Sequence, residues 1–466
     1  MRGETDFDLL IDRKDSQAFR QILNEQNIKL LVAAPGRNYP SMENYLGFDE
    51  KTGSFFHLHV HYKLVLGERF VKNYRLPFEN DFLAKVNVHY GVKVPVPELE
   101  IIVLSIRALL KYRARDLIKD NIPFRGPGLN PEYRVEIEWL LAQTNINKIV
   151  AVLNDLDNVI TADEIEEFLR IARSGKKAGF KLQLIKSRIK QRLSLFQRSN
   201  AFSATIIYFR ELWLRRNYWR SSPITKMTFP EGGQTIALIG ADGAGKSTIT
   251  DLLVRWLSWK LDVYDLYLGS TKPSRRSSFS YFIFRLLRRS TRLVGEKNLL
   301  GKLLAWLRDI LLYLHHYFTG HDRYKRYESG EKRAIAGSVV LFDRYPLEAF
   351  NTNSVTFDEM DAAKIPSLAS ERKDPLTQSL MRAEQGIYGK FRSPDCVIVL
   401  DVSPEISISR KPDHDPEVIE KKIKGVRTLL KVIRSDHRDV RFVQINADLP
   451  FDQVVLQIKK SIWALL

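Results

Sequence analysis

Short apolar runs, separated by segments with helical periodicity, dominate the chain from Thr225 to its end. Strands that helices cover on both faces have such unbroken apolar runs, whereas half-exposed strands alternate. The pattern therefore predicts an α/β domain over residues 225–466 with a five-stranded parallel sheet, whose ligands bind at the carboxyl ends of the strands. The predicted strands are Thr235–Ile239, Val263–Leu268, Ser338–Phe342, Cys396–Asp401 and Arg441–Ile445.

The first hundred residues alternate strand and helix signals, which predicts an α+β domain over residues 1–100. The segment Phe55–His61 alternates strictly, so His57, His59 and His61 share one face of a predicted strand. These histidines fit either metal ligands or a polar sheet face, and the absence of a nearby Cys or Glu favours the polar face. The other predicted elements are the strands Phe7–Ile11 and Lys29–Ala33 and the helix Ser16–Glu25.

Helical periodicity predominates from Pro97 to Arg220, so residues 101–222 are predicted to be a helical extension that ends in a linker around residues 221–223. Thr161 has the position of an N-cap ahead of an apolar-periodic run. Basic residues alternate with leucine and isoleucine between residues 176 and 192. Such a helix binds phosphates, nucleic acid or anionic lipid, or presents a solvated face, and the solvated face is the commoner case.

The formal charge of +18 over 466 residues fits anionic ligands such as nucleotides, or an acidic surface. No arginine-rich tail or zinc-ligand spacing accompanies this charge, so nucleic acid is not expected as a partner. The single cysteine, Cys396, excludes an intrachain disulfide and favours a cytoplasmic protein. The start of the sequence has no signal-peptide pattern. The most apolar helix candidate, around residues 303–318, contains Arg308 and Asp309, so it is too short and too charged for a transmembrane segment and is expected to be a core helix.

The strongest chemical signal lies between the first strand of the predicted sheet and the helical run that follows it. Glycines there let backbone N–H groups converge on phosphate oxygens, and the positive end of the next helix points to the same place. Lys246 would reach the terminal phosphates, and Ser247 would hold Mg²⁺. The predicted phosphate loop consists of Gly240, Ala241, Asp242, Gly243, Ala244, Gly245, Lys246 and Ser247.

The third predicted strand ends in Asp343, Arg344 and Tyr345. A carboxylate at this point orients Mg²⁺ through water, and the neighbouring guanidinium forms paired hydrogen bonds with a phosphate. A strand-end salt bridge would explain the same residues if they stood alone. Because parallel strands end at a common edge of the sheet, the nearby phosphate loop favours the catalytic interpretation.

The C-terminal half resembles the thymidylate kinase family of nucleoside monophosphate kinases. The phosphate loop, continued through Thr248, has the family's Asp-Gly-Ala-Gly-Lys-Ser-Thr form, and His321-Asp322-Arg323 precedes Asp343-Arg344-Tyr345 as in the family. Further matches are Ser393-Pro394-Asp395, the run from Val399 to Glu405, Ser409-Arg410-Lys411 at the entry to the lid, and Ile445-Asn446-Ala447 at the adenine-side loop.

This resemblance implies an ATP- and Mg²⁺-dependent kinase that phosphorylates a nucleoside monophosphate. It is also compatible with a homodimer. Arg323 and Arg344 would bind the acceptor's phosphate, and Asp242 would accept a hydrogen bond from its sugar. Arg410 and Lys411 lie where the closing lid supplies cations. The implied catalytic residues are Lys246, Asp343, Arg344, Arg323 and Arg410, with Ser247 and Asp343 at the metal ion. The implied ATP-binding residues are Gly240, Asp242, Gly243, Ala244, Gly245, Lys246, Ser247, Thr248, Lys411 and Asn446.

Two departures from the family concern the acceptor. The family's Glu-Pro-Gly segment is replaced here by Tyr267-Leu268-Gly269-Ser270, and an arginine-rich insertion follows from about Arg275 to Arg292. The insertion fits either a larger phosphorylated substrate or an amphipathic helix packed on the kinase. Two alternatives to a thymidylate-type kinase therefore stay open: a P-loop kinase with another small phosphorylated acceptor, and a non-catalytic ATP-binding scaffold.

Asp6 and Asp8 flank one residue at the start of a predicted strand, so both carboxylates can share a divalent cation or simply form a solvated strand end. Together with the strand at 57–61, Tyr74-Arg75-Leu76-Pro77 and the helix after Pro97, they resemble the nucleotidyltransferase superfamily over about the first 120 residues. That family has a third carboxylate on a later strand, where this sequence has histidines. It also has a glycine turn before the aspartates that this sequence lacks, which leaves catalysis by this domain open.

Overall fold

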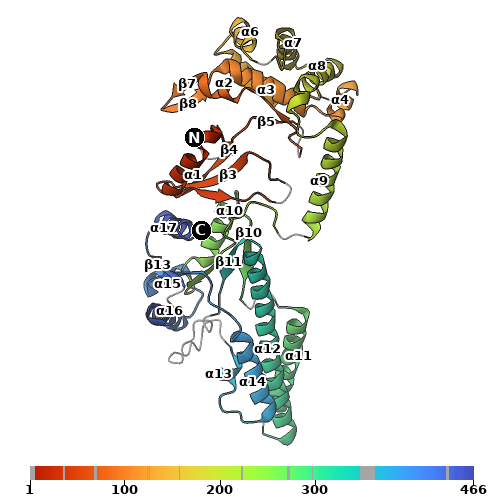
Figure 1. The fold of residues 1–466 in the computed structure, drawn as a ribbon. Coiled ribbons are helices and arrows are strands. Elements are labelled where there is room, and N and C mark those ends of the chain that lie inside the picture. Colours follow the sequence, from red (N-terminus) through yellow and green to blue (C-terminus); the bar gives the residue numbers. More distant parts are fainter. Residues whose placement is uncertain are drawn as a thin grey trace. The chain divides into compact units, whose positions relative to one another are not determined.

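A computed structural model of the chain describes residues 6–34, 37–67, 71–122, 124, 126–156, 158–221, 224–269, 273–295, 297–346, 363–436 and 440–466, without the side chains of 215–221 and 432–436. The chain forms two compact units (Figure 1). Unit 1 comprises Met1–Gly47 and Phe56–Ser222, and unit 2 comprises Phe48–Phe55 and Pro223–Leu466.

Unit 2 is built around a five-stranded parallel sheet in the order β10-β11-β9-β12-β13, which confirms the predicted sheet. The central strand β9 is buried along its whole length, as its unbroken apolar run indicates. The strands are β9 (Thr235–Gly240), β10 (Val263–Tyr267), β11 (Val339–Asp343), β12 (Cys396–Asp401) and β13 (Arg441–Asn446).

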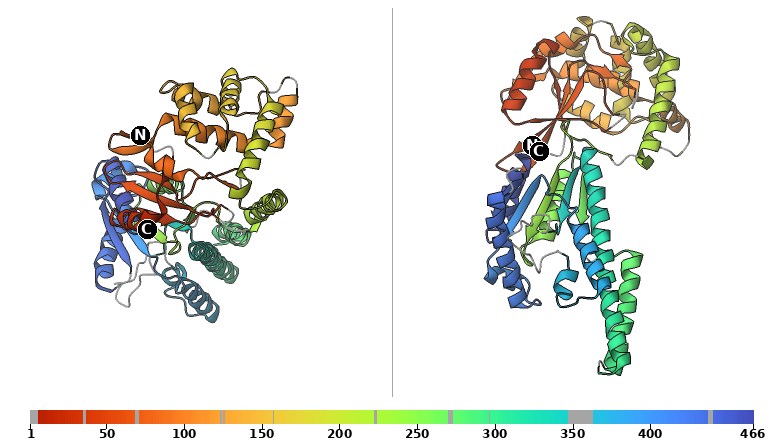
Figure 2. Two further views of the ribbon diagram at one scale, coloured as in Figure 1. Left: turned by 45° about the horizontal axis from the view of Figure 1, so that its top comes forward. Right: turned by 60° about the horizontal axis from the view of Figure 1, so that its bottom comes forward.

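Helices lie on both sides of this sheet (Figure 2). One face of the sheet packs against α12 and α16 through a core that includes Ala237, Ile239 and Phe342. Along each strand, these residues alternate with residues whose side chains point to the opposite face. The helices α10 and α17 also contact the strands. The helices of unit 2 are α10 (Lys246–Leu257), α11 (Arg275–Val294), α12 (Leu299–Ile335), α13 (Ile365–Leu368), α14 (Pro375–Tyr388), α15 (Pro404–Arg410), α16 (Pro416–Asp436) and α17 (Phe451–Trp463).

The arginine-rich insertion forms the helix α11, which packs against the 37-residue helix α12. The apolar candidate around residues 303–318 is part of α12, where Tyr313 is buried but Leu303 is 53% exposed. This stretch therefore has one buried face and is not a core helix all round. No helix among the described residues has the length and apolar character that a membrane span requires.

Unit 1 contains a four-stranded sheet in the order β1-β4-β3-β2, in which β1 and β4 run parallel and β2 and β3 antiparallel. The predicted helix α1 (Ser16–Glu25) has the expected bounds, whereas the sequence patterns did not reveal β3. The sheet strands are β1 (Phe7–Leu10), β2 (Lys29–Leu31), β3 (Met42–Asp49) and β4 (Ser54–His61). Two small two-stranded sheets follow, formed by β5 (Val65–Leu66), β6 (Tyr74–Arg75), β7 (Val86–His89) and β8 (Val92–Pro95).

The helices between Pro97 and Arg192 share one hydrophobic core with the segment around Leu76, so residues on both sides of position 100 pack together. Pro97 begins α3, where its missing N–H costs nothing, and Thr161 caps α7 through a capping box with Glu164. The helices are α2 (Glu79–Ala84), α3 (Pro97–Lys111), α4 (Ala114–Asn121), α5 (Glu132–Leu141), α6 (Ile146–Asn154), α7 (Ala162–Ser174), α8 (Gly179–Arg192) and α9 (Ala201–Ser221).

Candidate functional site

The predicted phosphate loop connects the end of β9 to the start of α10. Gly243 and Gly245 have φ angles of 81° and 85°, a left-handed conformation that other residues rarely adopt. A Cβ atom on Gly243 would lie 2.7 Å from the Ser407 carbonyl oxygen at α15. Both glycines are therefore required by the backbone path, and the strand–loop–helix context of the prediction is present.

Lys246 is the first residue of α10, and its Nζ donates hydrogen bonds to the carbonyls of Gly240 and Ala241 at 2.7 and 2.8 Å. The ammonium group thus lies against the loop on which a phosphate would bind. Ser247 and Thr248 follow in the first turn of the helix and are exposed. Both residues lie at the positive end of the helix dipole, where anions such as phosphates are favoured.

Basic side chains from other elements lie close to Asp242 of the loop. Its Oδ2 atom lies 2.5 Å from Lys422 Nζ of α16 and 3.6 Å from His414 Nδ1, and its Oδ1 lies 4.0 Å from Arg344 Nη2. Burial would raise the pKa of Asp242, but the hydrogen bond from Lys422 and the charges of Lys246 and Arg344 hold the pKa below its usual value. The Asp242 side chain is therefore a carboxylate that holds several cations at the loop.

Arg410, at the end of α15, connects the two predicted nucleotide segments. Its Nη1 atom donates to the carbonyl oxygens of Gly243, at 3.4 Å, and Ala447, at 3.3 Å. Asn446 ends β13 beside this contact, and its Oδ1 accepts a hydrogen bond from the Asp448 amide at 3.0 Å. Lys411 is exposed at the end of α15. The structure thus brings Arg410 to the phosphate loop and leaves Lys411 at the surface.

Asp343 and Arg344 lie at the carboxyl end of β11, next to the strand that leads into the phosphate loop. Asp343 is buried, with an exposed fraction of 7%. Arg344 has a φ angle of 59°, and a non-glycine residue holds this conformation at a cost of about 1–3 kcal/mol. Its guanidinium carbon lies 5.7 Å from the centre of the Tyr267 ring. This turn directs the arginine toward the sheet edge where the loop lies.

Arg323 is buried on α12, and its Nη1 donates a hydrogen bond of 2.8 Å to the Tyr388 hydroxyl of α14. One turn further along α12, Arg326 donates to the carbonyls of Tyr267, at 2.8 Å, and Gly269, at 3.1 Å. Burial and the charge of Arg323 lower the pKa of Arg326. Two guanidinium groups thus crowd the carboxyl end of β10, where the family's Glu-Pro-Gly segment would stand.

The pKa of His316 reflects burial and the same positive charges. Burial, together with the charges of His315, Lys364 and Arg323, lowers the pKa of His316 to about 4. His316 is therefore neutral near pH 7, because protonation would add another charge beside existing cations. An anionic ligand would be stabilised in this part of unit 2.

Two residues of this site, Lys422 and Arg326, are missing from the sequence predictions. Arg326 follows Arg323 by three residues, so helical spacing could have placed both on one face of α12. Lys422 lies 180 residues after Asp242, and no local pattern connects them. The sequence of residues 346–388, which follows Asp343-Arg344-Tyr345, does not match a thymine-binding element; residues 347–362 of this segment are not among the described residues, and α13 and α14 follow them.

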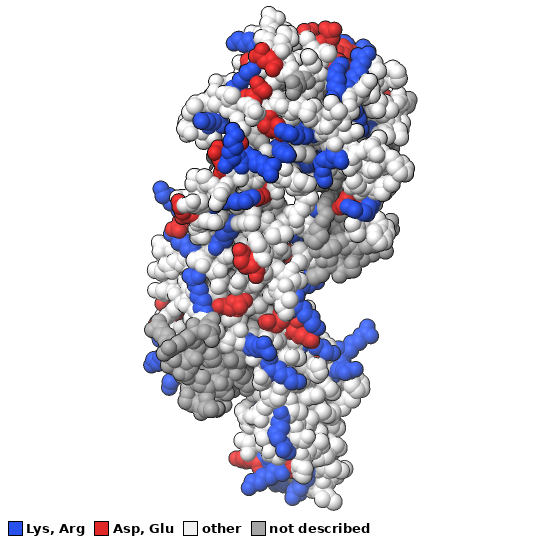
Figure 3. All heavy atoms as spheres, viewed as in Figure 1, with Lys and Arg blue, Asp and Glu red and all other residues white. Residues whose placement is uncertain are grey.

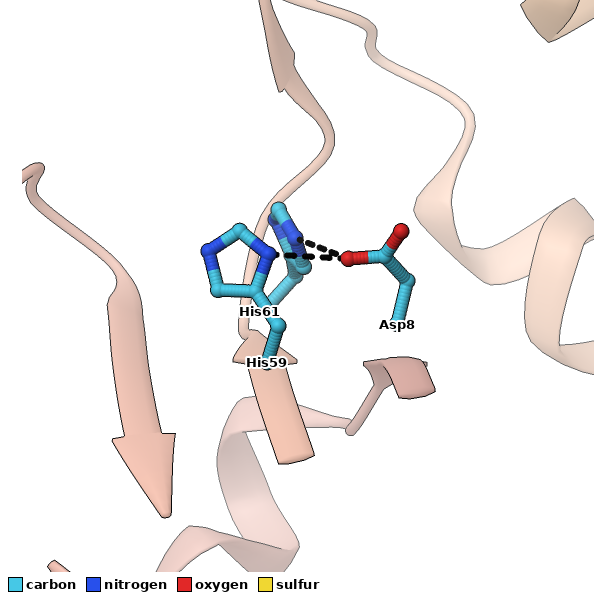
Figure 4. A group of neighbouring side chains, drawn as sticks. All are labelled: Asp8, His59 and His61. Carbon is cyan, nitrogen blue, oxygen red and sulfur yellow. Dashed lines mark hydrogen bonds and ion pairs between the residues drawn. The ribbon is translucent and has the colours of Figure 1, made fainter. Parts of the chain in front are cut away.

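In unit 1, the two predicted metal-binding aspartates have different partners. Asp8 Oδ1 lies 2.8 Å from His59 Nδ1 and 3.6 Å from His61 Nε2 (Figure 4), whereas Asp6 Oδ1 lies 3.0 Å from His57 Nδ1. Burial would raise the pKa of Asp8, but the two histidines lower it strongly. A metal site shared by Asp6 and Asp8 stays a prediction, and Asp8 is grouped instead with the histidines of β4.

Comparison with known proteins finds sequence relatives for about half of the chain, and no family model matches. The "Uncharacterized ATP-binding protein YghR" of Escherichia coli is 26% identical over 237 residues, or 49% of this chain and 86% of that protein. The "Uncharacterized ATP-binding protein YghS" of the same species is 24% identical over 243 residues, or 50% of this chain and 94% of that protein. A solved deoxyadenosine kinase from M. mycoides with bound dCTP is 18% identical, with a TM-score of 0.30, over 49% of this chain and 98% of that chain.

Replacing Gly243 with alanine should destabilise unit 2 more than the same change at Gly245. Both glycines have positive φ angles, 81° and 85°, but only Gly243 has a backbone oxygen within 3.0 Å of the added Cβ. A positive φ angle costs alanine about 1–2 kcal/mol in either variant, so the difference between the variants reports the steric contact with Ser407. Thermal unfolding of the two variants measures it, and equal melting temperatures would contradict the loop geometry.

Proposed function

We propose that unit 2 is an ATP- and Mg²⁺-dependent kinase of the thymidylate kinase type, which transfers a phosphoryl group to a nucleoside monophosphate. The observation that carries the proposal is the convergence of cationic groups from separate elements at one end of a parallel sheet. Lys246 comes from α10, Arg344 from the end of β11, and Arg410 from the end of α15. The names of the two Escherichia coli relatives, which describe ATP-binding proteins, support the donor half.

The donor half consists of the loop and the residues that contact it. Backbone N–H groups between Gly240 and Lys246 would hold the phosphates of ATP, and the Lys246 ammonium would exchange its two carbonyl partners for phosphate oxygens. Arg410 already contacts the Gly243 carbonyl and would add positive charge on the lid side. Lys411 would add a second cation on the lid side, and Asn446 would lie toward the adenine.

The oxygen donors of Ser247 and Asp343 fit Mg²⁺, which prefers hard oxygen ligands and keeps several of its waters. Ser247 is exposed at the start of α10, and Asp343 is a buried carboxylate on the neighbouring strand. The ion would neutralise charge on the phosphates during transfer. The protein's own part is to hold the phosphates and the acceptor in line.

The acceptor half would be formed by Arg323, Arg344 and Arg326. An oxygen of the acceptor's phosphate would form a bond to the γ-phosphorus of ATP as the bond to the β–γ bridging oxygen breaks, which leaves ADP and the phosphorylated acceptor. Guanidinium groups suit this task because they form paired hydrogen bonds with phosphate oxygens. Asp242 would face the acceptor sugar once Lys422 has moved to the phosphates.

A second acceptor class is favoured by one observation. Arg326 holds the carbonyls of Tyr267 and Gly269, in the place of the family's Glu-Pro-Gly segment. A Cβ on Gly269 would lie 2.2 Å from the Tyr267 ring, so this ring covers the glycine. These contacts leave the phosphate-binding arginines in place but alter the contacts around the acceptor's base. Another small phosphorylated molecule could therefore replace the nucleotide.

A panel of acceptors separates these functions. The full-length protein would be incubated with γ-labelled ATP, Mg²⁺ and either nucleoside monophosphates or sugar phosphates, and transfer of the label would be measured. We expect Mg²⁺-dependent transfer to at least one nucleoside monophosphate. Transfer to sugar phosphates alone would establish the second acceptor class. ATP binding without transfer to any acceptor would overturn the kinase and leave an ATP-binding scaffold.

A further inference from the structure

We propose that Asp8, His59 and His61 of unit 1 bind one divalent transition-metal ion, such as Zn²⁺, and that this ion helps to bind a small phosphorylated ligand in the adjoining cavity. This site belongs to unit 1 and does not depend on the kinase activity proposed for unit 2. The three side chains offer ligand atoms that all lie within 4.8 Å of one another (Figure 4).

The sheet of unit 1 places these ligands. β1 and β4 run parallel with Asp8 opposite His59 and Leu10 opposite His61, so the two histidines, two residues apart, emerge on the face that carries Asp8. β4 is an inner strand, between β1 and β3. Its backbone is therefore held on both sides, which fixes the spacing of the two imidazoles before a metal ion arrives.

The chemistry of the donor set points to a transition metal. Two imidazole nitrogens and one carboxylate are common ligands of Zn²⁺ and of non-haem Fe²⁺, and such sites keep at least one position open for water or substrate. Mg²⁺ prefers oxygen ligands and would be held poorly by two histidines. The His59–His61 ring centroids are 4.5 Å apart, so small rotations of the side chains are enough to direct both rings to a common ion.

The ligands open into a cavity of about 530 Å³, a size typical of small-molecule sites. Lys72, Arg107 and Lys111 line its wall, and the acidic side chains there are Asp6, Asp8, Glu100 and Glu136. Figure 3 shows Lys and Arg side chains gathered on this part of unit 1. A bound divalent ion would offset the negative charge of Asp8. Lys72, Arg107 and Lys111 would then attract a phosphate group toward the open metal position.

The pKa of Lys72 is consistent with an anion-binding cavity. Burial and the nearby charges of Lys111 and Arg107 lower the pKa of Lys72 to about 8, although the charge of Asp8 opposes this shift. These cations therefore repel one another inside the cavity, and an anion placed among them would relieve the repulsion. The acidic residue Glu100, whose pKa is raised by burial and by Glu136, contributes less negative charge than an exposed glutamate would.

Metal binding is tested by titrating the metal-free full-length protein with Zn²⁺ in a calorimeter, and with Co²⁺ while recording visible absorption. We expect one strong Zn²⁺ site per chain, and affinity at least about 100-fold weaker in His59→Ala, His61→Ala and the isosteric Asp8→Asn. The matched control is His89→Ala, because His89 is an exposed histidine of unit 1 outside the group. Excess Mg²⁺ should not compete.

Equal Zn²⁺ affinity in the wild type, His59→Ala and His61→Ala would overturn the proposal, as would the absence of Zn²⁺ binding. The result would then assign these contacts to hydrogen bonds between Asp8 and the histidines. Circular dichroism of the metal-free variants establishes that they fold. Asp8→Asn preserves the side-chain volume, so its affinity decides the matter if a histidine variant does not fold.

Ligand binding is tested with inorganic phosphate as the probe. The chain used carries Lys246→Ala, which weakens phosphate binding at the loop of unit 2. We expect phosphate to bind in the presence of Zn²⁺ and about tenfold more weakly in Lys111→Met, with Lys93→Met, an exposed lysine of β8, as the control. Phosphate binding that is independent of both Zn²⁺ and Lys111 would exclude the cavity as the ligand site.

Discussion

Replacing Lys246 with alanine is expected to lower kcat/KM for phosphoryl transfer by about 10²–10³-fold, because the variant loses the cation that would neutralise charge on the transferred phosphate. The Nζ atom already lies 2.7 and 2.8 Å from two loop carbonyls, and residues 240–247 contain no other lysine or arginine. Initial rates with labelled ATP and the acceptor identified in the panel measure the effect. The dissociation constant of ATP, measured by calorimetry, should rise as well.

The control for this change is Arg255→Ala, which removes a cation from the last turn of the same helix, where the side chain is exposed. Its rate should match that of the wild type. Melting temperatures of both variants should stay close to the wild-type value, since Lys246 lies at the start of its helix and its side chain is only partly buried. A Lys246→Ala variant with the wild-type rate would refute the assignment of the loop as the ATP site.

Replacing Arg323 with methionine is expected to raise KM for the acceptor by about 10²-fold and to leave KM for ATP nearly unchanged. The reason is that paired hydrogen bonds from a guanidinium to a phosphate are charge-assisted and strong. Arg323 is 5% exposed and bonded to the Tyr388 hydroxyl, so its guanidinium is held in place before the acceptor arrives. Steady-state kinetics with each substrate varied in turn measures the two constants.

Two further variants make this result specific. Arg333→Met removes another arginine of α12, one that stacks at 3.7 Å on Tyr264 near the opposite end of β10, and should leave both constants unchanged. Tyr388→Phe removes only the hydrogen bond that orients Arg323, so its effect on the acceptor KM should be smaller. Equal losses for ATP and acceptor in Arg323→Met would instead indicate a disturbed fold around α12.

The phosphate loop and the sheet of unit 2 could be predicted from the sequence because their signals are local. The inner strands β9, β11 and β12 are apolar along almost their whole length, and the predicted bounds of all five strands agree with the structure to within one residue. The loop residues Gly243 and Gly245 stand where the backbone needs left-handed conformations, so residue type and conformation coincide. The strands of unit 1 were harder to predict, since β3 contains charged and polar residues at intermediate burial and its apolar residues follow no clear alternation.

The sequence alone determined the position of the loop that we propose binds phosphate in unit 2, because spacing within eight residues specifies that loop. Only the tertiary structure decided which side chains meet there. Lys422 reaches Asp242 across 180 positions, and Arg323 reaches Tyr388 across 65. Likewise, the parallel register of β1 and β4 brings Asp8 to His59 across 51 positions. Contacts of this kind depend on how strands and helices pack, and packing reflects the whole core more than any local pattern.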